Sequence, residues 1–144
     1  MTRLELAIQV AMSFLGRPYI WGGDDPMRGF DCSGFCIEIL KSIGALLRRG
    51  DLTADGLYNF YKDCEKSYPN PGYLVFWGRL IKTHVEFCLD ENYSIGASGG
   101  SSKTTTEAEA IKQNAYIKVR PIDSKPYTKY YVDPFKFNFY DRNT

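Results

Sequence analysis

The hydrophobic pattern of this chain changes its period once, near residues 68–72, and that change limits the folds open to it more than any other feature. Before this segment, apolar residues recur every three or four positions, which is typical of amphipathic helices. After it they gather in short runs rich in β-branched and aromatic residues, which is typical of strands. The sequence YPNPG separates the two parts. Helices followed by antiparallel strands predict an α+β fold, and we expect a single domain over residues 1–144.

Three helices are expected before the break. The first covers about residues 4–15, and the second covers residues 33–47 and ends at the sequence RRG, residues 48–50. A shorter third helix lies within residues 52–66. The N-terminal helices should therefore pack on a small antiparallel sheet formed by the rest of the chain.

The strands are expected in YLVFWG, THVEFCL and YSIGAS, and the segments AYIKVRPI and YYVDPFKFNFY add one or two more. Residues 90–92 are short enough to join the second and third runs as a hairpin. A polar loop and a helical turn at residues 106–114 follow. The tail places Phe135, Phe137 and Phe139 on one face, which predicts an edge strand facing the core, with a docking surface as the alternative.

Charge and hydropathy exclude several partners. The 18 basic and 17 acidic residues leave a formal charge of +1, so nucleic acid is not an expected partner. No uncharged apolar stretch approaches the length needed to cross a membrane. The first residues begin as a signal peptide does, but Glu5 and Gln9 interrupt the apolar run and no small-residue cleavage site follows. We therefore expect no export signal.

The four cysteines are expected to stay as thiols. No C-x-x-C spacing occurs and the chain has one histidine, so neither a structural zinc site nor another cofactor is predicted. Cys36, Cys64 and Cys88 are expected to be small core residues.

Cys32 differs from the other cysteines because it falls at the start of the second predicted helix. The first turn of a helix leaves unpaired N–H groups whose positive field stabilises an anion, so the pKa of a thiol there should be lowered. The same N–H groups could hold the oxyanion that forms when a thiolate attacks a carbonyl. His84, on a predicted strand, is available as the base.

The sequences GRPYIWGG, FDCSGF and THVEFCLDENYSIGAS resemble the NlpC/P60 family of papain-like cysteine peptidases, which cleave peptide stems of bacterial cell walls. The resemblance implies that Cys32 is the nucleophile and His84 the general base. It also implies that Tyr19 faces the cysteine and helps to position the substrate or oxyanion. Asp31 and Ser33 match residues that flank the nucleophile and line the substrate cleft, although either could simply cap the helix.

The chain departs from the family pattern at the third catalytic position. There the family has a polar side chain, commonly histidine, that orients the imidazole, whereas this chain has Gly96. Three substitutes are conceivable: a backbone carbonyl or water at Gly96, Ser98 on the same strand, or Glu86, which shares a strand face with His84. We favour the backbone carbonyl or water.

The expected activity is hydrolysis of amide bonds in peptidoglycan stem peptides, at the bond between D-glutamate and a diamino acid. One alternative is an amidase or acyltransferase of the same superfamily. Another is a wall-binding or phage-assembly module without turnover, for which Gly96 is the best support. With no export signal, the chain is expected in the cytoplasm of the producing cell or, if phage-encoded, on a virion tail or released on lysis, with a phage structural protein as a possible partner.

Overall fold

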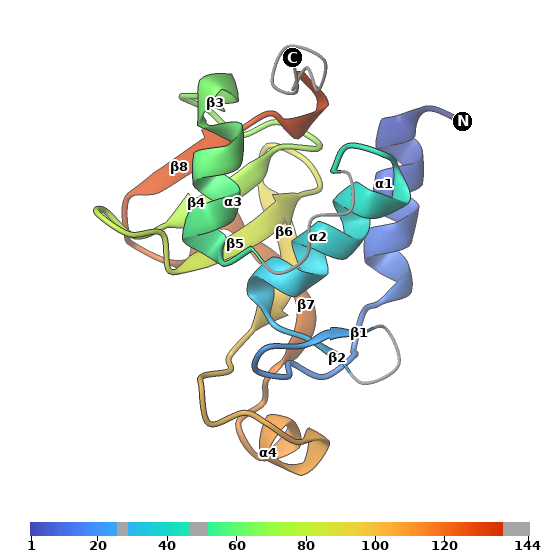
Figure 1. Ribbon diagram of the computed structural model, residues 1–144, viewed down its shortest axis with the longest axis vertical. Coiled ribbons are helices and arrows are strands. Elements are labelled where there is room, and N and C mark those ends of the chain that lie inside the picture. Colours follow the sequence, from blue (N-terminus) through green and yellow to red (C-terminus); the bar gives the residue numbers. More distant parts are fainter. Residues whose placement is uncertain (26–28, 47–51, 137–144) are drawn as a thin grey trace.

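The computed structural model describes residues 1–25, 29–46 and 52–136. Its centre is a six-stranded antiparallel sheet with strand order β3-β8-β4-β5-β6-β7, and helices cover one face of that sheet (Figure 1). The α+β fold predicted from the sequence is therefore confirmed. The sheet strands are β3 (Glu65–Lys66), β4 (Leu74–Trp77), β5 (His84–Cys88), β6 (Tyr93–Ser98), β7 (Tyr116–Pro121) and β8 (Lys129–Val132).

The helices begin at polar residues that accept from the first turn. They are α1 (Arg3–Ser13), α2 (Cys32–Ser42), α3 (Ala54–Tyr61) and α4 (Glu107–Lys112). Thr53, for example, accepts from the backbone of Gly56 at 3.0 Å and so starts α3. Short 3-10 turns follow α3, β7 and β8, namely η1 (Lys62–Cys64), η2 (Ile122–Ser124) and η3 (Pro134–Lys136). In the described ranges, no helix combines the length and apolar character needed to cross a membrane.

Helix α2 ends earlier than the sequence pattern predicted. Gly44 has a φ of +71°, its N–H donates to the Lys41 carbonyl at 3.1 Å, and the Ala45 N–H donates to the Leu40 carbonyl at 2.9 Å. This pair of bonds is a Schellman motif, which closes the helix after Ser42. The prediction missed it because apolar residues continue at helical spacing beyond the glycine. The expected end at residues 48–50 lies outside the described residues.

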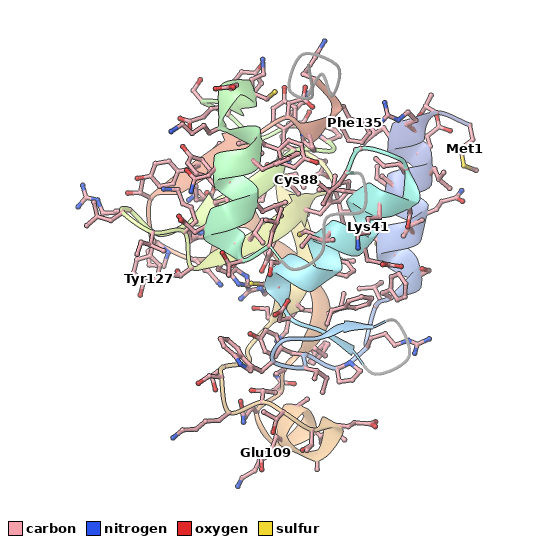
Figure 2. All side chains as sticks on the ribbon, in the orientation of Figure 1. Met1, Lys41, Cys88, Glu109, Tyr127 and Phe135 are labelled. Carbon is pink, nitrogen blue, oxygen red and sulfur yellow. The ribbon has the colours of Figure 1, made fainter. Side chains whose placement is uncertain are left out.

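Each face of the sheet packs a separate apolar cluster. Phe76, Val85 and Phe87 point toward the helices, where the main core lies, and side chains fill the space between the helices and the sheet (Figure 2). Their neighbours along the strands, such as Val75 and Cys88, point to the opposite face and form a smaller cluster there. This alternation fixes which side of β5 each residue occupies.

As far as residue 136, the C-terminal tail lies in an inner strand and a 3-10 turn, and not in the expected edge strand. Strand β8 lies between β3 and β4, so it is an inner strand of the sheet. Phe135 falls in the 3-10 turn after it, where its ring packs against the core and under the Arg3 guanidinium, 5.6 Å away. Phe137 and Phe139 lie outside the described residues. A two-residue ladder of β1 (Asp24–Asp25) and β2 (Gly29–Phe30), which the sequence pattern did not predict, precedes α2.

Candidate active site

Cys32 is the first residue of α2, as the sequence indicated. Asp31 precedes it in an extended conformation, and its carboxylate accepts from the Gly34 N–H at 2.7 Å and from the Ser33 hydroxyl at 3.3 Å. Asp31 is therefore the N-cap of this helix. Gly34 is required because a Cβ there would lie 2.1 Å from the carbonyl oxygen of Gly23, which crosses close to the helix start. The sequence DCSG thus fixes where the thiol emerges.

Helix α2 packs across β5 and brings Cys32 to the strand that carries His84. The backbone N–H groups of Ser33 and Val85 point at the Cys32 sulfur. Cys32 and His84 line one open cavity of about 470 Å³. The other residues that line it are Tyr19, Thr83, Ala97, Ser98, Gly99, Gly100, Arg120 and Lys125.

Tyr19 stands in the wall of this cavity, on a short bridge to Phe30 in β2. Its side chain is buried, and burial, together with the nearby Cys32 and Asp31, raises the pKa of its hydroxyl well above the ordinary value. The hydroxyl therefore stays protonated at any physiological pH and is available as a hydrogen-bond donor.

The imidazole of His84 is held by Glu86, two residues further along the same strand. His84 Nε2 lies 2.7 Å from Glu86 Oε2. The same carboxylate accepts from the Ser94 hydroxyl at 2.7 Å and from Arg120 Nη2 at 2.9 Å. The preference for a backbone carbonyl or water as the orienting group is therefore wrong. Alternation along β5 puts both side chains on one face, and Ser94 and Arg120 on the next two strands complete the network.

Gly96 is glycine because Glu86 occupies the space beside it. A Cβ at Gly96 would lie 2.4 Å from Glu86 Cγ. The carboxylate thus enters from β5 instead of from β6, where the family pattern has its orienting side chain. The absence of a side chain at Gly96 consequently no longer argues for a domain without catalysis. Ser98, the other candidate, is buried in the cavity wall.

The acid–base state of the pair differs from the expectation for a helix start. Burial raises the pKa of the Cys32 thiol to about 11, with Asp31 adding to the shift, and the N–H groups of Val85 and Ser33 only partly oppose it. Burial lowers the pKa of His84 below its ordinary value of 6.5, although Glu86 acts in the other direction. The lowered thiol pKa that the sequence predicted is therefore wrong, and at neutral pH the free site holds a neutral thiol beside a neutral imidazole.

Glu86 itself remains charged. Burial alone would raise the pKa of its carboxyl, but the hydrogen bonds and charges of His84, Ser94 and Arg120 outweigh burial and lower the pKa to about 2. After His84, the Ser94 hydroxyl and the Arg120 guanidinium contribute most to this lowering. An imidazolium that forms during a reaction would therefore be stabilised by a negative charge already in place.

Comparison with known proteins decides the family. The model of the NlpC/P60 family matches residues 16–134, which include Tyr19, Cys32, His84 and Glu86. The chain belongs to the NlpC/P60 family. Its sequence is 42% identical over 126 residues to the probable endopeptidase YafL of Escherichia coli, which covers 82% of this chain and 49% of that protein. It is 30% identical over 125 residues to the murein DD-endopeptidase MepH of the same organism, covering 82% and 45%.

The chain therefore spans about half the length of these two relatives, which are both named endopeptidases. Solved structures agree on the fold. The NlpC/p60 domain of the peptidoglycan hydrolase SagA gives a TM-score of 0.64 at 24% identity, covering 90% of this chain and 97% of that one. The P60 domain of antigen MAP1204 from M. avium subspecies paratuberculosis gives 0.66 at 22% identity, covering 94% and 96%. The NlpC-type papain-like fold is thus confirmed.

Asp31 and Ser33 do not line the cavity that holds Cys32 and His84. They line a second pocket of about 290 Å³ together with Trp21, whose side chain is half exposed. The remaining residues of that pocket are Gly22, Gly23, Gly34, Ile37, Lys41, Leu52 and Thr53. The two residues therefore cap α2 and also face an open surface beside the nucleophile.

Ser94 and Arg120 belong to the site, although the sequence pattern did not point to them. Their only signal was the hairpin and the strand that follows, which bring their side chains to the face of Glu86. The other three cysteines differ in burial: Cys36 and Cys88 are buried as expected, whereas Cys64 is only partly buried. Nowhere in the described ranges do three His, Cys, Asp or Glu side chains gather as metal ligands.

Proposed function

We propose that this chain is a cysteine peptidase that hydrolyses amide bonds in peptidoglycan stem peptides, between D-glutamate and a diamino acid. The observation that carries the proposal is the shared cavity of Cys32 and His84, with the imidazole held by the charged Glu86. Relatives named as murein DD-endopeptidase and as muramidase/DL-endopeptidase support the substrate class. The choice of the D-glutamyl bond is part of the proposal.

The first half of the reaction forms a thioester. Because both groups are neutral at rest, His84 accepts the thiol proton as the Cys32 sulfur attacks the scissile carbonyl. The carbonyl π electrons move to oxygen, and that oxyanion is stabilised by backbone N–H groups at the start of α2 and by the protonated hydroxyl of Tyr19. When the intermediate collapses, the C–N bond breaks and His84 passes its proton to the departing amine.

The second half regenerates the enzyme. His84, neutral again, takes a proton from water as the water oxygen attacks the thioester carbonyl. The C–S bond then breaks, the imidazolium returns the proton to sulfur, and the acyl product leaves as a carboxylic acid. Glu86 stabilises the imidazolium in both halves without exchanging a proton itself.

The test is to incubate the full chain with defined muropeptides and identify the products by mass. Cleavage that yields a free D-glutamyl carboxyl and a new diamino acid amine supports the proposal, and Cys32→Ser must abolish it. Cleavage at another peptide bond would correct the bond, and a stable acyl transfer to an added amine would favour an acyltransferase. Release of no product from sacculi that nevertheless retain the protein would refute turnover.

Its place of action is a further part of the proposal: the producing cell's cytoplasm, or a virion tail or lysate if a phage encodes it. Peptide mapping of the cell fractions of the source organism, and of virions if it carries a phage, tests this directly.

A further inference from the structure

Two cationic side chains line the cavity that holds Cys32 and His84, and the proposed reaction steps do not use their charge directly. Arg120 lies on β7, and Lys125 directly follows η2. Of the described residues in that lining, none is Asp or Glu. The carboxylate of Glu86, which pairs with His84 and Arg120, is only 1% exposed. The accessible wall of the cavity is therefore positively charged.

Lys125 lies on the histidine side of the cavity. Its Nζ is 5.0 Å from the centre of the Trp77 ring, and the centres of the Trp77 and His84 rings are 5.4 Å apart. In the proposed reaction His84 delivers a proton to the departing amine. The part of the substrate that leaves with this amine must then lie on the side of the cavity where Lys125 and Arg120 are found.

Lys125 also lacks a carboxylate partner within the described part of the chain, where the ion pairs join Glu86 to His84 and Arg120, and Asp123 to Lys129. Burial lowers the pKa of the Lys125 ammonium. The Glu86 charge opposes this shift, and the Arg120 charge adds to it. An anion arriving from solution would raise that pKa again, because it stabilises the ammonium. Arg120 likewise has a buried Nε without a hydrogen-bond partner among the described residues.

We propose that Arg120 and Lys125 form a carboxylate-binding subsite for the amino acid that leaves with the amine. The proposal rests on the proposed peptidase function and names its substrate class: stem peptides with diaminopimelate, whose side chain ends in a free carboxylate, rather than lysine, whose side chain does not. The carboxylate of D-glutamate on the acyl side is a second source of the same chemistry. The position of Lys125 beside Trp77 and His84 favours the leaving residue.

The experiment uses three synthetic stem peptides. The first has both carboxylates free, the second has the side-chain carboxylate of diaminopimelate converted to an amide, and the third has the α-carboxylate of D-glutamate converted to an amide. An amide removes the charge with little change in size. The wild-type chain is compared with Lys125→Gln, with Lys125→Arg, which keeps a cation, and with Lys118→Gln. Lys118 is a matched control, because it lies on the same strand as Arg120 but does not line the cavity.

For the wild type we expect kcat/KM to fall about tenfold when the diaminopimelate carboxylate is amidated, mainly through KM. In Lys125→Gln the ratio of kcat/KM on the first peptide to kcat/KM on the second should be close to one, whereas Lys125→Arg and Lys118→Gln should keep most of the wild-type ratio. The Cys32→Ser variant should show the same discrimination in Kd, measured by calorimetry, which separates binding from turnover.

Equal wild-type rates on the first two peptides would overturn the subsite and leave the peptidase function standing. A discrimination that follows D-glutamate amidation instead would assign the cations to the acyl side and overturn the proposal as stated. If the folded wild type cleaves none of the peptides, the proposed function fails and the subsite fails with it. A thermal melt of each variant identifies any that does not fold, and Lys125→Arg then decides in place of Lys125→Gln.

Discussion

Replacing Glu86 by glutamine tests the least expected feature of the site, the carboxylate that holds the imidazole from the histidine's own strand. The amide keeps the size of the side chain but removes the charge that lies 2.7 Å from His84 Nε2. It also leaves Arg120, now 2.9 Å from a neutral group, as an uncompensated charge near the imidazole. Both changes disfavour the imidazolium that forms during the reaction.

The expected loss follows from these contacts. A hydrogen bond to a charged group contributes about 1.5–3 kcal/mol, which corresponds to about a 10- to 150-fold change in rate. The full loss should appear in kcat, because the imidazolium exists only after the thiol has been deprotonated. Ser94→Ala is the matched control: it removes a donor to the other oxygen of the same carboxylate and does not touch His84, so its loss should stay below about tenfold.

The assay is steady-state hydrolysis of a stem peptide across pH, with circular dichroism to confirm folding. For the wild type, the rate plotted against pH should form a broad bell. Its acid limb should lie below pH 6.5, where His84 is protonated, and its alkaline limb near pH 11, where the Cys32 thiol ionises. In Glu86→Gln the acid limb should move to lower pH, because the carboxylate that supports the protonated imidazole is gone. A folded variant with kcat within threefold of wild type and an unmoved acid limb would refute this reasoning.

Three further outcomes are expected. The rate of Cys32 alkylation by iodoacetamide should rise about tenfold per pH unit until near pH 11, and a plateau already at pH 7 would instead reveal a thiolate–imidazolium pair. Gly96→Ala should lower activity, and urea titrations should show a loss of about 1–3 kcal/mol in the free energy of unfolding, because the new Cβ would displace Glu86. Gly56→Ala in α3 is the control: a Cβ there meets only ordinary contacts, so neither activity nor stability should fall. Since the folded pKa of Glu86 is about 2 and its ordinary value 4.5, its contribution of up to about 3 kcal/mol is present above pH 4.5 and lost as pH falls toward 2. Urea midpoints measured over that range should therefore fall less steeply in Glu86→Gln, and parallel curves would contradict the assignment.

The order of elements could be predicted from the sequence because each depends on local pattern. Helical spacing identified α1, α2 and α3, and β-branched and aromatic runs identified β4, β5 and β6 with their hairpin. Element ends were less certain, since the end of α2 depends on the positive φ of Gly44, which competes with an apolar pattern that continues past it. The inner position of β8 could not be predicted, because a strand's neighbours are chosen by long-range pairing.

Local sequence determined where Cys32 lies, because an N-cap aspartate and a glycine that permits close backbone approach define the helix start within four residues. It also put Glu86 within reach of His84, because residues two apart in a strand share a face. What it did not determine was which group holds the imidazole, and whether the thiol is ionised. Both depend on groups that meet only in the folded chain.

Tertiary structure decided those two questions. Three adjacent strands bring His84, Ser94 and Arg120 to the Glu86 carboxylate, and together they lower its pKa although burial acts to raise it. Partial burial of Cys32 in the cavity wall raises the pKa of its thiol despite its place at a helix start. A sequence pattern reports helix position, whereas the free energy of a buried charge depends on every dipole and charge that packing brings near it.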